Sequence, residues 1–435
     1  MRVRGGRWLA LGAVAALAAT TAGCSDEPSS AGVAHVESTA PHERPTDEES
    51  AAGAQLMTHV ALELYDPIAE AAGDGNVAFS PVSIGVTLGM VRAGAEGDSA
   101  DQLDEFFGGA DPDTLHRSLG GATAALEDLA GPVPMADGDM GEIELTNANA
   151  LWGQSGVTWK PSFLDQLRLG YDASMWTADY QRDPGRARAE INDWVAEHTR
   201  EHITELLPDG SIDTDTRLVL TNAVFFKAPW PEPLDERPKD LPFTTASGKT
   251  VEAPAMTTSG TYRYLVGPGW QAATVPYAGG KLAMTFMVPE EGALAAFEDE
   301  LDDDLLHQIL TGGDPDTAVA LAIPRFDLDQ RSPVGKALRE VGVTAPFTTR
   351  TNFEPMTTDP QAQPLRLDDV LHQATVTVDE NGTEAAAATG AVFTTVGGAI
   401  TEHELTIDRP FLFAIHDLED GTPLFLGRVT DPTVP

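Results

Sequence analysis

Cysteine is almost absent from this sequence, because Cys24 is the only one in 435 residues. A disulfide within the chain is therefore excluded, and the folded part must be stable without one. Basic residues are also few, with 27 Lys and Arg against 68 Asp and Glu, which gives a formal net charge of −41. A surface this acidic repels phosphate backbones and sulfated polysaccharides, so we expect neither nucleic acid nor heparin as a partner.

Long hydrophobic runs are missing as well. The apolar stretch from Trp8 to Thr20 is too short to span a bilayer, which takes ~20 residues. It follows three arginines within the first seven positions, and together these features predict a secretory signal peptide over residues 1–23. The expected location is therefore secreted or extracytoplasmic.

The segment from Thr21 to Cys24 resembles a bacterial lipobox, with Thr21 where that pattern favours Leu. It predicts a lipid on Cys24, and the alternative is ordinary cleavage nearby with a free thiol. Residues 24–50 are rich in Pro, Ser, Glu and Asp and are predicted to be a disordered tether. Membrane contact is expected only through the lipid, with a single domain following over residues 51–435.

A run of small residues near the C-terminus is the most unusual stretch that is present. From Ala385 to Ile400 there is no charge, no proline and no large side chain except Phe393. Such a run buries too little area for a core strand and is too short to span a membrane. Gly382 precedes it and allows the backbone to fold back. The pattern favours a segment with two states, exposed in one and inserted into a sheet in the other.

Several blocks of the chain resemble the serpin family, in family order from about residue 51 to 432. The blocks are Asn76–Ser83, Gly94–Ala100, Leu145–Trp152, Ala189–Val195, Leu206–Ile212, Thr216–Trp230, Asp408–Phe413 and Gly421–Val429. The resemblance implies a mixed α/β serpin fold, with three β-sheets, about eight or nine helices and an exposed reactive-centre loop. The residues alone agree, since helical spacing over Ala51–Ala72 is followed later by alternating strands such as Leu282–Val288.

The resemblance also assigns residues to two places in the main sheet. A polar hydrogen-bonded cluster under the centre of the sheet, called the shutter, matches Ser80, Ser83, Asn222 and His372. The breach, where the loop enters at the top of the sheet, matches Trp230, Arg325 and Glu380. Arg325 stands where the family often has Lys, which preserves the charge.

The implied activity is suicide-substrate inhibition of a serine protease. The protease attacks the loop and forms a covalent acyl-enzyme, and the cleaved loop then inserts into the main sheet as a strand. The hinge that must insert is Glu380, Gly382, Thr383, Glu384, Ala385, Ala386, Ala387 and Ala388. The resemblance implies no catalytic site, no metal and no cofactor, and the chain is expected to be a monomer.

The bond that the protease attacks follows from two counts along the loop. Family spacing from Glu380 places it at Val396-Gly397, whereas counting back from Pro410 places it nearer Ala399-Ile400. Val396 predicts an elastase-like or subtilisin-like target, and Phe393 keeps a chymotrypsin-like target as the alternative. No Lys or Arg occurs between Gly382 and Asp408, which excludes trypsin-like and thrombin-like targets.

Two rival functions remain at this point. A non-inhibitory serpin with a binding or chaperone role usually has large, charged or proline residues in the hinge, unlike this chain. An enzyme would need a site, and His198-Thr199-Arg200-Glu201-His202 fits the H-x-x-E-H zinc pattern. The spacing suits zinc, but we predict that this helix ends almost at once, before Leu206-Leu207-Pro208, and that the segment is a solvated helix end.

Overall fold

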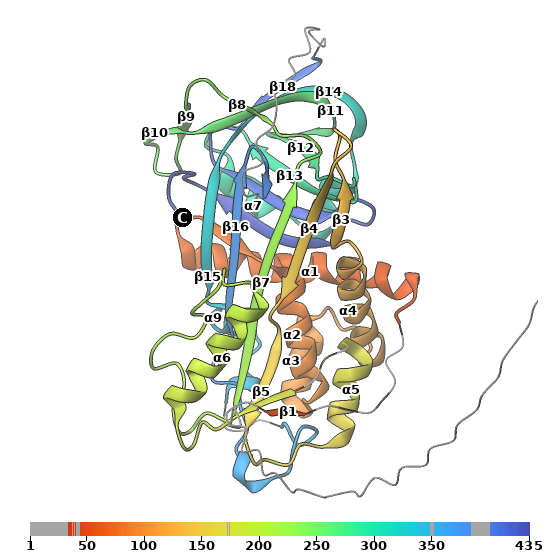
Figure 1. Cartoon of the computed structure of the whole chain (residues 1–435), viewed down its shortest axis with the longest axis vertical. Coiled ribbons are helices and arrows are strands. Elements are labelled where there is room, and N and C mark those ends of the chain that lie inside the picture. The colour runs from red at the N-terminus through yellow and green to blue at the C-terminus, as the bar shows by residue number, and fades with distance from the viewer. Residues whose placement is uncertain are drawn as a thin grey trace, which may run out of the picture. The chain divides into compact units, whose positions relative to one another are not determined.

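The structure is a computed structural model that describes residues 34–36, 38, 40, 44–171, 173, 175–348, 352–383 and 401–435. All of these residues fall within one compact unit (Figure 1). Several predictions lie outside the described residues: the signal peptide over 1–23, the lipid on Cys24, Phe393 and the bond Val396-Gly397. The same is true of the hinge residues Glu384, Ala385, Ala386, Ala387 and Ala388.

The described ranges contain nine α-helices, in agreement with the predicted number. They are α1 Asp47–Ala72, α2 Pro81–Ala93, α3 Gly97–Phe106, α4 Pro112–Glu127, α5 Pro161–Tyr171, α6 Pro184–His198, α7 Leu294–Glu300, α8 Asp303–Thr311 and α9 Val334–Glu340. Within these ranges, no helix is both long enough and apolar enough to cross a membrane.

The N-terminal part of the domain differs from the prediction. Helix α1 begins at Asp47 rather than at residue 51, because Thr46 and Glu49 form a capping box that extends it by an acidic first turn. The short strand β1, Ala34–Val36, lies in the predicted tether and pairs with β6, Met175–Ala178. The polar composition of residues 24–50 as a whole concealed these two short ordered pieces.

The main sheet has nine strands in the described ranges. Its central order is β1-β6-β5-β7-β17-β16-β15, and β4 pairs with both β7 and β3. The further bounds are β3 Gly131–Pro134, β4 Met140–Asn147, β5 Ala150–Gln154, β7 Leu218–Pro229, β15 Phe326–Ser332, β16 Leu371–Asp379 and β17 Gly382–Thr383. The predicted alternating strand Leu145–Trp152 is interrupted at Ala148-Asn149, where β4 ends and β5 begins, although both strands pair with β7 in one register and the Ala148 N–H still donates to the Ala223 carbonyl.

A second nine-stranded sheet lies above the main one, and a two-stranded sheet completes the three that were predicted. The second sheet is ordered β18-β14-β11-β12-β13-β19-β20-β2, with β8 on β11. Its strands are β2 Val77–Phe79, β8 Asp235–Glu236, β11 Ala255–Gly267, β12 Trp270–Pro276, β13 Leu282–Pro289, β14 Asp314–Pro324, β18 His403–Thr406, β19 Phe411–Asp417 and β20 Pro423–Val429. The small sheet pairs β9, Leu241–Thr244, with β10, Thr250–Ala253.

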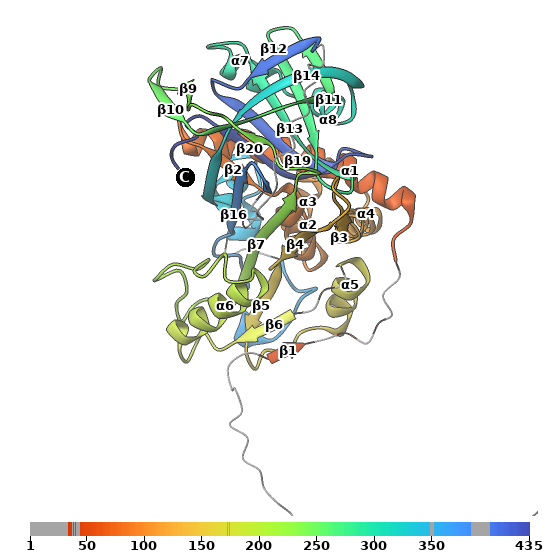
Figure 2. The same ribbon diagram turned by 45° about the horizontal axis from the view of Figure 1, so that its top comes forward.

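Strand β7 is the centre of the main sheet and is covered on both faces. Val224 and Phe226 point into the large core that includes α2, whereas Ala223 packs with Val195 of α6 on the opposite face. In Figure 1, β15, β16, β7 and β4 run side by side along the long axis, and α6 lies over their lower part. Figure 2 turns the same view so that the second sheet comes forward.

Candidate functional site

The two central strands, β7 and β16, are paired along only part of their length. In the lower half, Leu371–Thr375 of β16 pairs directly and in parallel with Thr221–Phe225 of β7. At the upper end the short strand β17 lies between them, antiparallel to both. The upper end of the slot between β7 and β16 is therefore already occupied by the two residues of β17.

The turn that begins the loop is held by its own side chains. The Asp379 carboxylate accepts backbone hydrogen bonds from Asn381 (2.7 Å) and Gly382 (3.2 Å). Gly382 has φ 152°, and a Cβ added there would lie 2.2 Å from the carbonyl oxygen of Ala228. Glycine is needed because the neighbouring strand leaves no room for a side chain.

Thr383 is the first side chain of the loop that enters the core. It is fully buried, and its hydroxyl lies 2.6 Å from the Tyr277 hydroxyl. The Tyr277 ring stacks on Trp230 with centroids 4.5 Å apart, and burial raises the pKa of the Tyr277 phenol, so both hydroxyls stay neutral. The Trp230 indole in turn donates to the Asp379 carbonyl at 2.9 Å. Sequence reasoning found Trp230 and Thr383 but missed Tyr277, whose position at the end of β12 was the available signal.

The predicted ion pair at the breach is present beside this turn. An Arg325 guanidinium nitrogen lies 2.8 Å from a Glu380 carboxylate oxygen and 3.4 Å from Glu236. The Glu380 contact lacks hydrogen-bond alignment, and both side chains are nearly one-third exposed. The structure thus places Trp230, Arg325 and Glu380 at one turn, with the indole on its backbone and the guanidinium on its side chain.

The four predicted shutter residues lie together under the directly paired half of the slot. The Ser80 backbone N–H donates to His372 Nε2 at 3.0 Å, and His372 Nδ1 contacts the Asn222 side-chain oxygen. The Ser83 hydroxyl lies 2.9 Å from that same oxygen. Because His372 and Asn222 are opposite each other on β16 and β7, their side-chain hydrogen bond joins the two central strands directly.

The cluster is neutral and nearly dry. His372 is 1% exposed, and desolvation lowers its pKa to about 3, so the ring accepts at Nε2 and donates from Nδ1. Two further members were missed by sequence reasoning, since the Asn222 amide donates to Thr87 (2.9 Å) and Ser83 also contacts Asn149 (2.7 Å). Asn149 lies in the interruption between β4 and β5, which the predicted continuous strand concealed.

The zinc pattern is not a site. Helix α6 ends at His198, and Arg200 and Glu201 both have positive φ, so His202 leaves the helix on another path. His198 stacks on Trp194 and His202 on Phe225, each with centroids 3.9 Å apart. Among the described residues, no group of three His, Cys, Asp or Glu side chains is arranged to hold a metal.

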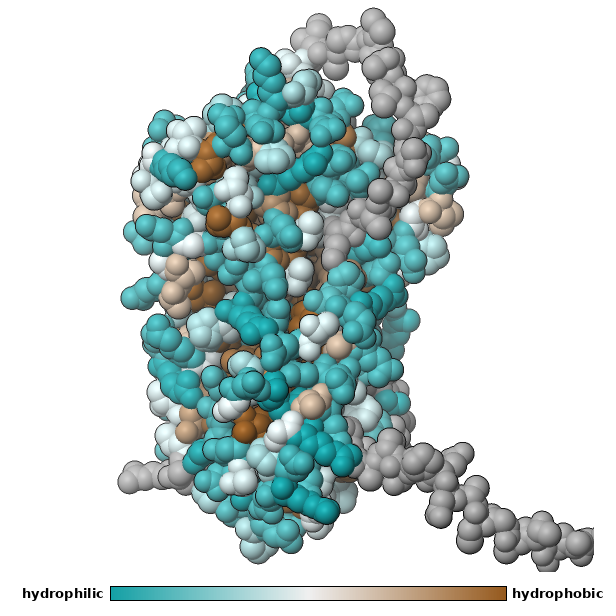
Figure 3. All heavy atoms as spheres, turned by 60° about the vertical axis from the view of Figure 1, so that its left-hand side comes forward, coloured by the Kyte–Doolittle hydropathy of each residue, from teal (hydrophilic) through white to brown (hydrophobic). Residues whose placement is uncertain are grey.

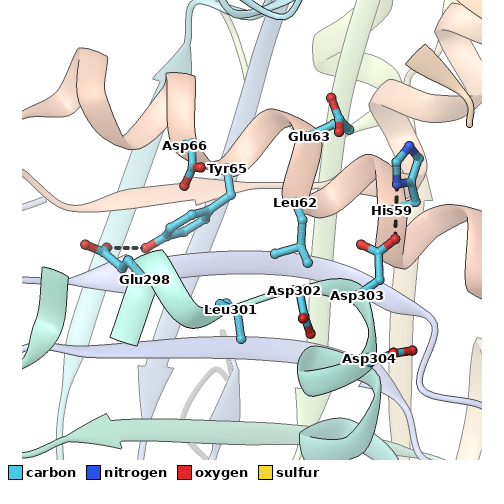
Figure 4. Close-up of a pocket in the computed structure, with 10 residues that line it drawn as sticks. All are labelled: His59, Leu62, Glu63, Tyr65, Asp66, Glu298, Leu301, Asp302, Asp303 and Asp304. Carbon is cyan, nitrogen blue, oxygen red and sulfur yellow. Dashed lines mark hydrogen bonds and ion pairs between the residues drawn. The ribbon is translucent and has the colours of Figure 1, made fainter. Parts of the chain in front are cut away.

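A separate cavity lies between α1 and the α7–α8 segment (Figure 4). Tyr65 donates to Glu298 (2.6 Å) there, and Arg428 contacts the same carboxylate at 3.0 Å. Burial, with Glu298 nearby, raises the pKa of Asp66. These contacts join α1 to α7 and β20. The residues around the cavity therefore stabilise the packing of these elements and do not line the slot between β7 and β16. The face in Figure 3 is largely hydrophilic, with apolar residues in scattered small groups.

Comparisons with known proteins cover nearly the whole domain. Residues 55–432 match the family model described as serpin (serine protease inhibitor). Serpin-ZXA of Oryza sativa subsp. japonica is 33% identical over 383 residues, covering 86% of this chain and 94% of that protein. The leukocyte elastase inhibitor of Bos taurus is 31% identical over 386 residues, covering 86% and 98%.

Solved structures show the same fold. A thermophilic serpin, Tengpin, in the native state aligns with a TM-score of 0.78 at 22% identity, covering 92% of this chain and 100% of that one. An Arabidopsis serpin in its native stressed conformation aligns with a TM-score of 0.75 at 27% identity, covering 88% and 99%.

Proposed function

This chain belongs to the serpin family, a family of serine protease inhibitors that also has non-inhibitory members, and we propose that it is a suicide-substrate inhibitor of serine proteases. The target's serine attacks the carbonyl carbon of the scissile residue, and an acyl ester forms as the amine of the next residue leaves. The cleaved loop then extends β17 between β7 and β16. The attached protease is carried along, and its geometry is distorted before water can hydrolyse the ester.

The observation that supports this proposal best is the position of β17. Thr383 is fully buried, and it is followed in the sequence by Glu384 and then by four alanines, without proline. Small side chains and free N–H groups are what insertion between two strands requires. Each new cross-strand pair contributes ~0.2–1 kcal/mol, so a strand of about ten residues gains several kcal/mol.

The proposed target is an elastase-like or subtilisin-like protease. Val396 at the proposed bond suits a small apolar primary pocket, and the bovine relative is named for elastase inhibition. The absence of Lys and Arg from the loop argues against trypsin-like targets. Phe393 supports the second candidate, a chymotrypsin-like protease.

Incubation with a purified elastase tests the inhibitory proposal. We expect a covalent complex that survives boiling in detergent, and mass spectrometry of the released peptide identifies the bond. A loop that is cleaved without any complex would instead indicate a non-inhibitory serpin. Trypsin is the matched control, and it should form no complex through the loop.

We also propose that the mature protein is secreted and acylated at Cys24. The support is the basic and apolar N-terminus and the lipobox-like segment ending at Cys24. Expression in a bacterium with labelled fatty acid should label the parent chain but not Cys24→Ser. An unlabelled parent recovered from the medium would indicate ordinary cleavage.

A further inference from the structure

The breach turn, Glu380-Asn381 between β16 and β17, carries a chemically unstable pair of residues. Asn381-Gly382 is the only Asn-Gly pair in the sequence. Asparagine is least stable before glycine, because the next residue then has no Cβ to shield its backbone nitrogen from the asparagine side chain. Packing requires Gly382, since a Cβ there would lie 2.2 Å from the Ala228 carbonyl oxygen. The instability of the pair is therefore tied to the choice of asparagine at position 381.

The reaction open to this pair is deamidation. The Gly382 nitrogen gives its proton to water and attacks the side-chain carbonyl carbon of Asn381, and the side-chain nitrogen leaves as ammonia. Water then opens the resulting five-membered succinimide ring at one of its two carbonyls. The product is aspartate, or isoaspartate, in which the main chain runs through the side-chain methylene. Overall, one amide and one water become one carboxylic acid and one ammonia.

In the folded chain, hydrogen bonds hold the backbone that must rotate for this attack. The N–H groups of Asn381 and Gly382 both donate to one oxygen of the Asp379 carboxylate, at 2.7 and 3.2 Å. The Asn381 carbonyl accepts a hydrogen bond from the Trp230 N–H at 2.9 Å. Closure of the succinimide ring turns the peptide between Asn381 and Gly382, so these bonds must open before the nitrogen can reach its target.

Strand pairing restricts the same peptide, whereas the asparagine side chain is less confined. Gly382 pairs with Pro229 of β7 and with Asp379 of β16. The next residue, Thr383, is fully buried. The Asn381 side chain is half-buried, and the hydrogen bonds of this residue to the described part of the chain are made by its backbone. Water can therefore reach the side chain, while the attacking nitrogen is held in β17.

We propose that Asn381 is a deamidation site controlled by the breach turn, protected while β17 lies between β7 and β16 and modified when the turn opens. The inference does not depend on the proposed inhibitory function. Because local opening precedes the chemistry, the observed rate is the rate of the open chain multiplied by the fraction of time for which the turn is open. The amount of product then records how often β17 has left its place.

The modification changes the turn permanently. Both products put a carboxylate at position 381 directly after Asp379 and Glu380, and adjacent negative charges repel one another. Isoaspartate also lengthens the main chain by one carbon. The carbonyl that accepts from Trp230 and the Gly382 N–H that donates to Asp379 can then no longer both keep their places. A modified chain should hold β17 less firmly than the parent chain does.

A comparison of the folded and the denatured parent chain tests whether the turn controls the reaction. Both are kept at neutral pH, one in buffer and one in concentrated guanidinium chloride. Mass spectrometry of the peptide that contains position 381 detects the product, which is heavier by about 1 Da, and isoaspartate-specific methylation identifies its linkage. We expect the folded chain to react at least about ten-fold more slowly. Equal rates would overturn control by the turn, and no product in the denatured chain would overturn the site itself.

Asp379→Ala tests the carboxylate, because it removes the acceptor of both N–H groups. We expect it to raise the rate in the folded chain by about two- to ten-fold and to leave the rate in the denatured chain unchanged. Asp379→Asn is the matched control, since it removes the charge but keeps an oxygen acceptor, and it should raise the rate less. Asn381→Gln should give no product at this position. A folded Asp379→Ala chain that reacts at the parent rate would overturn the role of the carboxylate.

A measurement on the parent chain alone keeps the inference testable where Asp379→Ala does not fold. Folded parent is aged, and the deamidated fraction is separated by anion exchange through its extra negative charge. We expect the backbone amide of Trp230, which donates to the Asn381 carbonyl, to exchange its hydrogen at least about ten-fold faster in that fraction. Amides of β13 in the second sheet are the internal control and should exchange as before. Unchanged protection at Trp230 would overturn the inferred effect on the turn.

Discussion

The upper and lower halves of the β7–β16 slot are closed in different ways. In the lower half the strands pair directly, and Asn222 and His372 join them through a neutral, buried hydrogen bond. In the upper half the strands are already separated by Gly382-Thr383, packed beneath Tyr277. If the loop inserts as we propose, the lower half must break contacts before the loop can enter, whereas the upper half only has to extend contacts that exist.

This difference distinguishes the start of the proposed loop insertion from its continuation down the sheet. At the top, Thr383 already has the polar partner that a buried hydroxyl needs, so entry begins without an unsatisfied group. At the bottom, separating His372 from Asn222 leaves donors and acceptors that the incoming strand must satisfy, at ~1–3 kcal/mol for each one left unpaired. The top should therefore control whether insertion begins, and the bottom how readily the sheet opens.

Thr383→Arg should have the largest effect, because it disrupts the buried position of β17 between β7 and β16, from which insertion would start. A guanidinium in this fully buried position loses its hydration, and the substitution also removes the hydrogen bond to Tyr277. We expect covalent complex with elastase to fall to near zero while the loop is still cleaved, as measured on a denaturing gel. Thr383→Ser keeps the hydroxyl and should keep most of the complex. An unchanged yield with arginine would show that insertion does not pass through this position.

Asn222→Ala should have the second largest effect, because it weakens the lower half of the slot. Its side chain contacts His372, Ser83 and Thr87, and removing it leaves a cavity and several polar groups without partners. We expect the intact chain to lose about 2–4 kcal/mol in unfolding free energy. The loop-cleaved chain should lose less, because the new strand lies between β7 and β16 there. Equal losses in both states would mean that the cluster does not hold the slot closed.

The sequence predicted the two halves to a similar extent. The four shutter residues and the three breach residues were named from the family resemblance, and each group lies together. Tyr277 and Thr87 were missed because neither belongs to a recognisable pattern, and they reach the sites only through side-chain contacts that form when the end of β12 and helix α2 pack against the main sheet. The break at Ala148-Asn149 was missed because alternation continues across it, so periodicity alone could not reveal Asn149 as a contact of Ser83.

The fold was predicted more completely than the short strands and the positions at which its elements begin and end. Long periodic segments such as α1 and β13 were found, whereas β1 was hidden in a polar segment because three residues carry too little pattern. The pre-inserted β17 was not predicted either. Its two residues form a strand only because they pair with neighbours such as Ala228 and Val378 in the folded chain, and this pairing depends on the tertiary structure.

Acid should weaken the lower half through His372. The pKa of about 3 in the folded chain lies below the usual 6.5, so the unfolded chain takes up the proton first as the pH falls. The stabilisation is complete above pH 6.5 and is lost toward pH 3, at about 1.4 kcal/mol per pH unit. His116 and His416 also have lowered pKa values, so the parent must be compared with His372→Gln. In His372→Gln, the unfolding free energy should depend less steeply on pH, by the slope that one proton contributes. Equal slopes for parent and variant would show that His372 does not cause the acid sensitivity.

The breach ion pair should have the smallest effect, because its side chains are partly solvated. Glu380→Gln should cost the intact chain less than about 1 kcal/mol, and the coupling to Arg325→Met should shrink as salt is raised toward 1 M. Glu236→Gln is the matched control, since Glu236 is 75% exposed and lies farther from the same guanidinium, so its loss should be smaller still. The pair lies beside the turn rather than inside the slot, so neither substitution should abolish covalent complex. A loss of complex with Glu380→Gln comparable to that with Thr383→Arg would show that the side of the turn, and not the buried hydroxyl, governs entry.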